Sequence, residues 1–456
     1  MKRDLKRDLP KLALICAVTL GVALGAVRYV SALHRFTPVF VQGTSQAGGT
    51  VGRGDAWVPD RIAFESNGDV LGNGNNTWQI FMFDLGERDM AGLPGLTQIT
   101  YGSFNARYPS ISMNFEIDVS RAYISFEADG DLCADPSNNC DALASPVSGR
   151  QVFMYSLTTR QIRQVTKGPG DCLNPDVSGF ANKIVFDSTT DLLGSGVIAT
   201  VPELYMGDLD AIGASCPQLP CPPGKDRFGK PLPRGLEQVT IGGGWHGSVS
   251  YNGKALAFES RGDLANGGVN PGVQHIYVIR KGVITQVSTG YEDARLPTIN
   301  SLGGRYVAYE QNKPVGGGSS VPHVIVVKAS RGGAKIRFSV PGFQPSLDAK
   351  GARVAFTSSV DLLENGSQGN QVFTQNLRRR RSNKGLTQIT QPPVTAGAAI
   401  STPFQLLAFV SSDDLTGAGN TTPQLFVSNF YKLAPSDFVT PYATPTPIET
   451  ATPGGP

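Results

Sequence analysis

Few residues of this chain have the types and spacing that catalysis requires. His34 lies near the N-terminus, and His246, His275 and His323 are interpreted as falling at different positions of the repeat described below. His246 follows Trp245 in a Gly-rich segment, a setting that would let its imidazole face a channel and meet a ligand. The alternative is a loop histidine hydrogen-bonded within the fold. No Gly-x-Ser-x-Gly nucleophile motif is present, so we predict no catalytic residue.

Six aspartates recur where a β-rich segment gives way to a loop rich in Asn and Gly. They are Asp69, Asp131, Asp191, Asp263, Asp361 and Asp414. A carboxylate at this position can accept backbone N–H groups and fix a turn, which is the role we predict. The alternative is calcium binding through carboxylate and amide oxygens. No loop contains the regular Asp-x-Asp-x-Asp-Gly series, so we predict no cofactor and no metal.

The cysteines indicate local disulfides. Cys133 and Cys140 bracket one loop, and Cys216 and Cys221 bracket another. Cys172 is left over, and it can replace either member of the first pair if the two loops pack together. Zinc is the weaker interpretation, because no Cys-x-x-Cys motif or histidine cluster accompanies these residues.

The N-terminus is typical of an export signal. Basic residues precede an uncharged run from Leu12 to Val27, and Val30 and Ala32 provide the small residues of a cleavage site. We expect a signal helix in residues 1–32 with cleavage after Ala32; the alternative is an uncleaved anchor, the only contact with a membrane that we predict. Export also permits disulfides.

Charge argues against nucleic acid as a partner. Residues 1–32 contain six basic and two acidic residues, so their removal changes the formal net charge from +3 to −1. The remaining basic run, Arg378–Arg381, is interpreted as a solvated turn.

One repeat organises most of the chain. A short lead-in segment precedes a β-rich segment with an anchor aromatic, as in IAFESNGDV (62–70); a second such segment follows, as in QIFMFDL (79–85), and a closing one, as in LTQIT (96–100). Successive anchors lie 47 to 72 residues apart: Phe64, Phe126, Phe186, Phe258, Tyr309, Phe356 and Phe409. Four strands per unit predict an all-β fold, a single β-propeller of four-stranded blades, with seven blades or, alternatively, six.

Both ends of the repeat region are incomplete. The last unit has no segment like LTQIT, and the first has no clear lead-in strand. We expect Thr37–Gln42 to pair with the last blade and join the ends, so that the propeller extends over 37–433. Residues 434–456 are rich in Thr and Pro and predict a disordered tail.

The unit SYNGKALAFESRGDL (250–264) followed by QHIYVIRKGVITQVS (274–288) resembles the WD40-like (PD40) repeat of TolB-like propellers. The resemblance covers roughly residues 57–430 and implies a propeller, although such propellers serve as periplasmic scaffolds, peptidase domains and parts of sugar-degrading enzymes. The Asn-Gly-Lys turn of the repeat is clear only at Asn252–Lys254, and the Asp-Leu loops are longer than usual.

We therefore expect an exported protein, periplasmic, secreted or at the cell surface, whose propeller binds a protein partner of the cell envelope without catalysis. Loops at one face, varied by insertion, would form the contact surface. One alternative is a carbohydrate-active or metal-binding propeller enzyme. The other is a structural module displayed at the surface on its Thr/Pro tail.

Overall fold

The computed structural model describes part of the chain at the level of single residues. The described residues are 40–42, 51–56, 61–71, 73–88, 94–112, 121–141, 149–193, 201–212, 218–221, 235–265, 272–316, 319–330, 333–378, 385–390, 396–401, 406–412 and 422–429. The predicted signal helix in 1–32 and the predicted tail in 434–456 lie outside them. None of the helices in this described part has the length and apolar character needed to cross a membrane.

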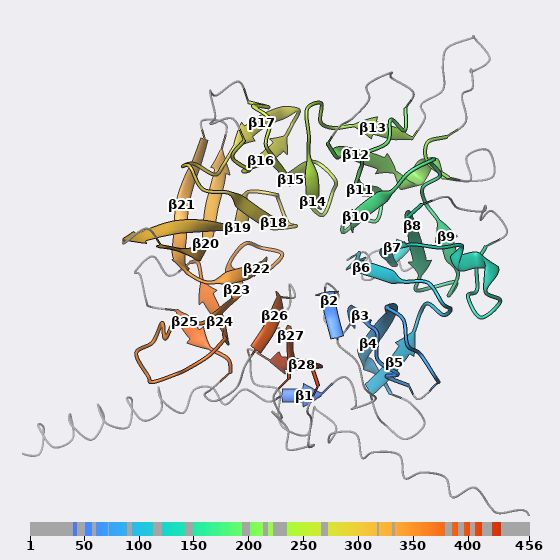
Figure 1. Cartoon of the computed structure of the whole chain (residues 1–456), viewed down its shortest axis with the longest axis horizontal. Helices are drawn as coiled ribbons and strands as arrows, with labels where there is room; N and C mark the ends of the chain where they lie inside the picture. Colours follow the sequence, from blue (N-terminus) through green and yellow to red (C-terminus); the bar gives the residue numbers. More distant parts are fainter. Residues whose placement is uncertain are drawn as a thin grey trace, which may run out of the picture.

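The described strands form seven four-stranded antiparallel sheets around a common axis (Figure 1). The first four sheets, in chain order, are β2 (Val51–Ala56), β3 (Arg61–Ser66), β4 (Gln79–Arg88), β5 (Pro94–Gln98); β6 (Ala106–Ile111), β7 (Tyr123–Ala128), β8 (Gln151–Ser156), β9 (Ile162–Gln164); β10 (Cys172–Val177), β11 (Lys183–Ser188), β12 (Glu203–Asp208), β13 (Leu236–Gln238); and β14 (Trp245–Val249), β15 (Ala255–Ser260), β16 (His275–Arg280), β17 (Val283–Gln286).

The remaining sheets follow the same order from the axis outward. They are β18 (Ala294–Ile299), β19 (Tyr306–Gly316), β20 (Ser319–Ser330), β21 (Gly333–Pro341); β22 (Phe343–Leu347), β23 (Arg353–Ser358), β24 (Gln371–Asn376), β25 (Leu386–Gln388); and β26 (Ala396–Ser401), β27 (Leu406–Ser411), β28 (Gln424–Asn429) with β1 (Phe40–Gln42). Two single-turn 3-10 helices, η3 (Leu132–Ala134) and η4 (Leu209–Ala211), lie in loops. The predicted all-β propeller with four-stranded blades is confirmed.

The chain ends meet in one sheet. β1 pairs with β28 and supplies the outer strand that the last repeat lacks, in the register Phe40 to Ser428 (Figure 1). This pairing was predicted from the sequence, although Thr37–Val39 lie outside the described residues. It joins the N-terminal segment to the last sheet and covers an otherwise open strand edge.

The anchor aromatics form the core of each sheet. In six sheets the anchor on the second strand stacks on an aromatic of the third strand, with ring centroids 5.5 to 6.0 Å apart. In the fifth sheet Tyr309 lies opposite Ile325 instead. Each aromatic pair contributes about 0.5–1.5 kcal/mol beyond the burial of its area, so the repeated anchor is explained by packing.

The closing segment of the repeat has a hydrogen-bonding role. Its last residue is Thr or Ser, and in five sheets this hydroxyl accepts a backbone N–H from the start of the third strand, at 2.9 to 3.0 Å: Thr100, Thr166, Thr240, Ser288 and Thr390. The hydroxyl thus satisfies a buried N–H where the strand pairing ends.

Antiparallel pairing gives the ring two different faces. The loops from second to third strands and the connectors between sheets lie at one end of the strands, which we call the loop face. The turns from first to second and from third to fourth strands lie at the other end, which we call the turn face.

Candidate functional site

A row of buried carboxylates follows the anchor aromatics in five successive sheets. At most 9% of each residue is exposed, and the five are Glu65, Glu127, Asp187, Glu259 and Glu310. Thr357 and Val410 occupy the corresponding positions of the sixth and seventh sheets. The row of carboxylates therefore covers the first five sheets and is absent from the sixth and seventh.

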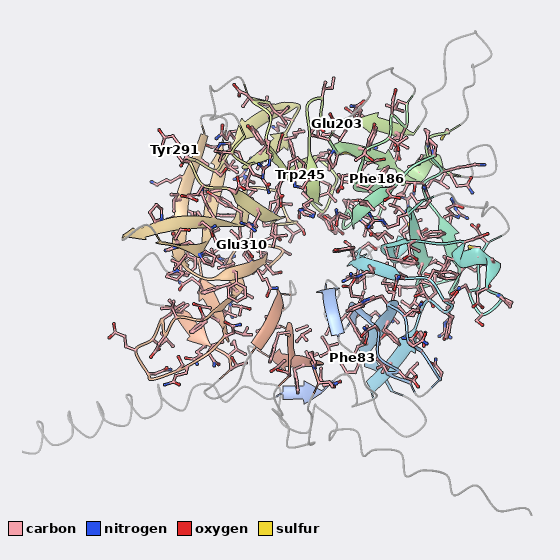
Figure 2. All side chains as sticks on the ribbon, viewed as in Figure 1. Phe83, Phe186, Glu203, Trp245, Tyr291 and Glu310 are labelled. Atoms are coloured by element: carbon pink, nitrogen blue, oxygen red, sulfur yellow. A yellow bond between two sulfur atoms is a disulfide. The ribbon has the colours of Figure 1, made fainter. Side chains whose placement is uncertain are left out.

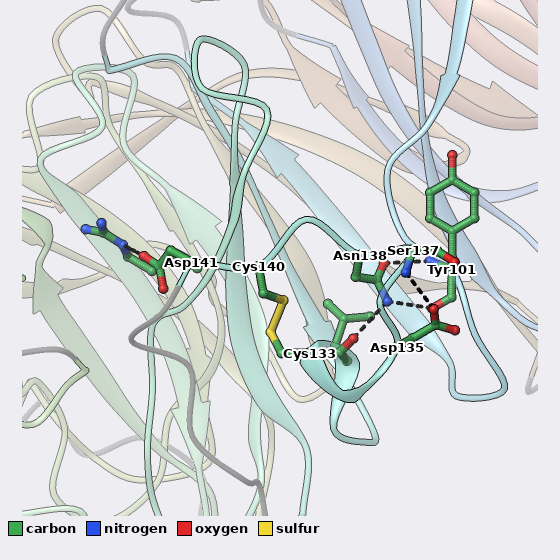
Figure 3. Close-up of a disulfide and its surroundings, with 9 residues drawn as sticks. Tyr101, Cys133, Asp135, Ser137, Asn138, Cys140 and Asp141 are labelled. Carbon is green, nitrogen blue, oxygen red and sulfur yellow. Dashed lines mark hydrogen bonds and ion pairs between the residues drawn. A yellow bond between two sulfur atoms is a disulfide. The ribbon is translucent and has the colours of Figure 1, made fainter.

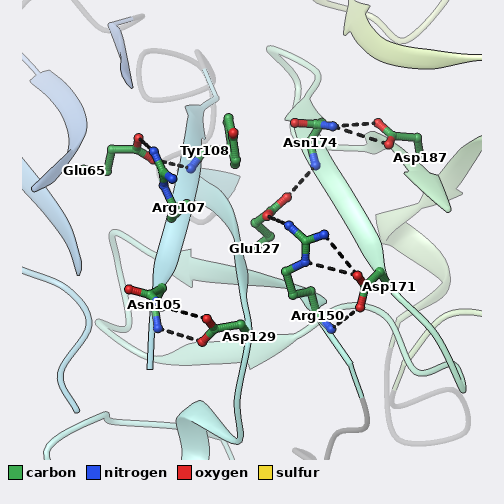
Figure 4. Close-up of polar contacts among 10 residues, drawn as sticks. All are labelled: Glu65, Asn105, Arg107, Tyr108, Glu127, Asp129, Arg150, Asp171, Asn174 and Asp187. Atoms are coloured by element: carbon green, nitrogen blue, oxygen red, sulfur yellow. Dashed lines mark hydrogen bonds and ion pairs between the residues drawn. The ribbon is translucent and has the colours of Figure 1, made fainter. Parts of the chain in front are cut away.

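Each carboxylate accepts a backbone N–H from the first strand of the next sheet. Glu65 accepts from Tyr108 at 2.7 Å, and Glu127 from Asn174 at 2.7 Å (Figure 4). The equivalent donors for Asp187, Glu259 and Glu310 are His246 at 3.4 Å, Leu296 at 2.6 Å and Gln344.

All five donor residues have a left-handed backbone. Their φ angles lie between 48° and 54°: Tyr108, Asn174, His246, Leu296 and Gln344. Each lies where the register of the first strand shifts against the second. A non-glycine residue in this conformation is strained and persists only when its surroundings hold it. The hydrogen bond to the carboxylate of the preceding sheet stabilises this conformation. The row of carboxylates therefore links successive sheets.

Two of these carboxylates also form ion pairs with arginines. A guanidinium N–H of Arg107 donates to Glu65 at 2.8 Å, and the same guanidinium lies over the Trp78 ring at 4.4 Å. Arg150 pairs with Glu127 at 3.2 Å and with Asp171 at 3.0 Å (Figure 4). The charges of Arg107 and Arg150 are therefore paired within the protein.

Burial perturbs the protonation of the row. It raises the pKa of Glu127 to about 7, against the opposing effects of the Asn174 hydrogen bond and the Arg150 charge. It raises the pKa of Asp187 to about 6, against the charge of His246 and the Asn174 hydrogen bond, and it also raises the pKa of Glu310. Part of this row therefore titrates near neutral pH.

His246, the predicted channel residue, lies between two of these carboxylates. Its Nδ1 lies 3.1 Å from the Glu259 carboxylate of its own sheet, and its N–H points to Asp187 of the third sheet. The side chain is 35% exposed. A carboxylate on Nδ1 fixes the orientation and the tautomer of an imidazole. Among the described residues, no group of three His, Cys, Asp or Glu side chains is arranged to hold a metal ion.

The interpretation that the three histidines occupy different repeat positions is wrong for two of them. His275 lies opposite Ser260 and His323 opposite Gln311, so both occupy the same register position of the third strand, opposite the residue two places after the anchor. Gln151 occupies this position in the second sheet, where it accepts a hydrogen bond from Thr166. The Nδ1 of His275 likewise lies 3.2 Å from the Ser288 hydroxyl. His275 therefore makes the structural contact that Gln151 makes in the second sheet.

The repeated aspartates lie in the loops from second to third strands. Asp69 accepts N–H bonds from Asn73 at 2.6 Å and Gly74 at 2.9 Å, and Asp361 accepts from Asn365 and Gly366 at 3.1 and 2.7 Å. These are the contacts of a turn-fixing carboxylate.

The other four aspartates differ. Asp191 accepts one N–H bond, from Leu193 at 3.2 Å. Asp131 precedes η3 without a side-chain cap bond. Asp263 lies in the corresponding loop of the fourth sheet, and Asp414 lies outside the described residues.

The cysteines form local staples. Cys133 and Cys140 are joined as a disulfide (Figure 3), and Asn138 between them exchanges hydrogen bonds of 2.8 Å with the Tyr101 backbone. Cys172 is free and buried on β10, so the alternative pairing through this residue is wrong. Cys221 is disulfide-bonded, and its predicted partner, Cys216, lies outside the described residues.

The loop face carries most of the exposed apolar side chains. Nine large hydrophobic residues of the described chain are exposed, and six lie on this face: Leu71, Val201, Ile241, Tyr291, Val360 and Leu363. Tyr291 is 82% and Ile241 72% exposed. Val201 adjoins Gly243, two residues after Ile241. Figure 2 shows Trp245 and Glu310 toward the centre of the ring and Tyr291 toward its periphery.

Sequence reasoning assigned no role to the carboxylate row. Its signal was present, because Glu or Asp follows the anchor in the five segments IAFES (62–66), ISFEA (124–128), IVFDS (184–188), LAFES (256–260) and VAYEQ (307–311). The contact partner lies in the next sheet, 34 to 59 residues away along the chain, and repeat alignment within one unit does not reveal it.

Comparison with known proteins bears on the fold alone. No family model and no curated protein matches the sequence. An oligogalacturonate lyase in complex with manganese is similar in structure, with 14% identity over 88% of this chain and 98% of that one and a TM-score of 0.50. At this identity the likeness shows a propeller and no more.

Two further solved propellers align less well. The β-propeller domain of the Trilobed protease from Pyrococcus furiosus is 9% identical over 85% of this chain and 95% of that one, with a TM-score of 0.49. A putative TolB from Agrobacterium tumefaciens is 12% identical over 74% and 95%, with a TM-score of 0.39. Membership of the TolB-like repeat family therefore stays a prediction.

Proposed function

We propose that this protein is an exported, non-catalytic propeller of seven blades that binds a protein partner of the cell envelope through its loop face. The observation that carries the proposal is that six of the nine exposed large hydrophobic side chains of the described residues lie on this face. Apolar side chains on loops held by a rigid scaffold are typical of protein interaction surfaces. The seven four-stranded sheets support the blade count. The N-terminal signal pattern and the Cys133–Cys140 disulfide support export.

The buried carboxylates support a structural role over a catalytic one. In the described part of the chain, each of the five buried carboxylates accepts a backbone N–H at a strained position. Groups committed to such contacts cannot move to follow a reaction without releasing the backbone they hold.

A capture experiment tests the binding proposal. A photo-crosslinker at the position of Ile241 or Tyr291 should trap one specific envelope protein, identified by mass spectrometry. The variant Ile241→Ser/Tyr291→Ser should lose pull-down of that protein at least tenfold, because it removes the two most exposed apolar side chains. Leu302→Ser removes an exposed apolar side chain at the turn face and serves as the control. Equal capture by both variants would exclude the loop face as the binding surface.

A carbohydrate-active enzyme is the second candidate, and the orientation of His246 by Glu259 is the observation that favours it. A histidine held in this way can act as a general base. The test is incubation with oligogalacturonates and manganese, with ultraviolet detection of unsaturated products. Turnover that disappears in His246→Ala would establish the enzyme and overturn the non-catalytic proposal.

A further inference from the structure

The fourth and fifth sheets carry a cluster of unpaired cations at the turn face and the outer edge. We call this cluster the basic edge, and it consists of Arg280, Lys281, Arg305, Lys328, Lys335 and Arg337. None of the six side chains makes an ion pair or hydrogen bond with the described residues. The strands β16, β17, β20 and β21 contain no acidic residue at all.

Strand pairing brings these cations together. Lys328 lies directly opposite Lys335, and Arg305 adjoins them because its carbonyl accepts the N–H of Ala329 at 2.8 Å. Arg280 ends β16, and the two-residue turn Lys281–Gly282 leads into β17. β17 contacts β21 of the next sheet. Like charges directly opposite in a sheet are destabilising, so folding alone gives no reason for this arrangement.

The same register position is neutralised elsewhere in the ring. Arg61 of the first sheet faces Asp84 and forms an ion pair with it, and Lys183 of the third sheet does so with Asp208 at 2.9 Å. In the fourth and fifth sheets the corresponding pairs are Ala255 with Arg280 and Tyr306 with Lys328.

β21 is unusual among the outer strands. It has nine residues, whereas the outer strands of the other sheets have three to five. It ends its sheet, at the left of Figure 1, and no described strand pairs with its outer edge. Ala334, Lys335, Ile336 and Arg337 are consecutively exposed along it. An open strand of this length is a template for an added strand.

We propose that the basic edge binds an extended acidic segment of a partner protein, which adds as a strand to β21. The main-chain groups of β21 supply the strand pairing, and the cations select acidic side chains. A second copy of this chain is disfavoured as the occupant, because antiparallel pairing of β21 with itself about Ile336 would place Lys335 opposite Arg337 of the other copy. Ile336, 56% exposed, and Val283, 49% exposed, add apolar contact that suits a polypeptide better than a phosphate backbone.

The proposal is independent of the loop-face function. The basic edge lies at the opposite ends of the strands and on the periphery, so either surface can fail its test without affecting the other.

Fluorescence anisotropy with a labelled ten-residue peptide of alternating threonine and glutamate tests the binding. We expect saturable binding to the full chain at low salt, weakened at least tenfold by Lys335→Glu/Arg337→Glu. Lys183→Ala, which removes a cation that has an acidic partner, is the matched control and should bind as the parent does. Both altered sites are exposed or partly exposed, and circular dichroism checks that the variants stay folded.

Hydrogen exchange then distinguishes strand addition from attraction by charge alone. The bound acidic peptide should slow amide exchange within Gly333–Pro341. An alternating threonine–lysine peptide should neither bind nor slow this exchange. The proposal is overturned if the acidic peptide fails to bind, if it binds without protecting β21, or if single-stranded DNA or anionic vesicles bind the same cations while the peptide does not.

Discussion

The first and third sheets differ from the fourth and fifth at one register position next to the turn face. In the first pair of sheets a cation on the second strand meets an aspartate on the third, as in Arg61 with Asp84. In the second pair the third-strand residue is itself a cation, and no acidic residue lies directly opposite it on either neighbouring strand. The sheets share the same four-stranded antiparallel plan, so we infer that this position contributes to the fold in one region and is left for binding in the other.

The carboxylate row shows the same division between repeated and variable positions. Glu or Asp recurs after the anchor in five sheets, where it holds the left-handed residue of the next first strand. The sixth and seventh sheets have Thr357 and Val410 there. The first strands that follow those two positions, β26 and β2, still carry a register shift against their second strands. The bulge is therefore kept where the carboxylate is absent, so the carboxylate is an addition to the repeat in five sheets.

The largest effect is expected from removing a paired cation. Arg61→Ala deprives Asp84, which is 1% exposed, of its ion pair, and we expect a loss of about 3 kcal/mol in the free energy of unfolding. Lys328→Ala at the exposed equivalent position should change it by less than about 0.5 kcal/mol. Urea unfolding of both variants checks this contrast. Similar losses in the two would show that the fold depends on the basic edge as well.

A smaller effect is expected from the titration of the row. Burial raises the pKa of Glu127 to about 7, so the folded state binds a proton more tightly than the unfolded state. This contribution to stability is fully present below the unfolded pKa, near 4.5, and is lost as pH rises through about 7.

Thermal unfolding between pH 5 and pH 8 measures this dependence. The parent should be more stable at pH 5, and Glu127→Gln should reduce the difference by about 1–3 kcal/mol. Lys335→Ala should leave the difference unchanged. An unaltered pH dependence in Glu127→Gln would assign the titration to another group.

The smallest effect concerns the like charges of the basic edge. Lys328→Glu places an opposite charge across from Lys335 and should stabilise the protein by about 0.5 kcal/mol. Lys281→Glu, in the turn between β16 and β17, has no residue directly opposite and serves as the control. Differential scanning calorimetry resolves the shift, and destabilisation by Lys328→Glu would mean that this lysine contributes to packing.

The repeat allowed most of the architecture to be predicted. The anchors Phe64 to Phe409 mark the second strands, and the missing last segment led to the pairing of Phe40–Gln42 with β28. The lead-in strands β2 and β26 were not found, because VGRGDA and AGAAIS lack the proline present in the lead-in strands ARYPSI, CLNPDV, ARLPTI and FQPSL.

The sites were less accessible to sequence reasoning, for a physical reason. The roles of Glu65 and Glu127 depend on N–H groups of the next sheet. The basic edge depends on which residues face each other across strands, and a net charge near zero conceals it. Local patterns report neither contact, whereas the turn role of Asp69 and Asp361 lies within a few residues and was predicted.

The most direct measurement is a titration of the acidic threonine–glutamate peptide into Arg61→Ala and Lys335→Ala/Arg337→Ala at a temperature where both are folded. If paired cations serve the fold and unpaired cations serve binding, Arg61→Ala keeps the parent Kd, and Lys335→Ala/Arg337→Ala raises it at least tenfold. Equal affinities in the two variants, or a weakened affinity in Arg61→Ala alone, would contradict this account.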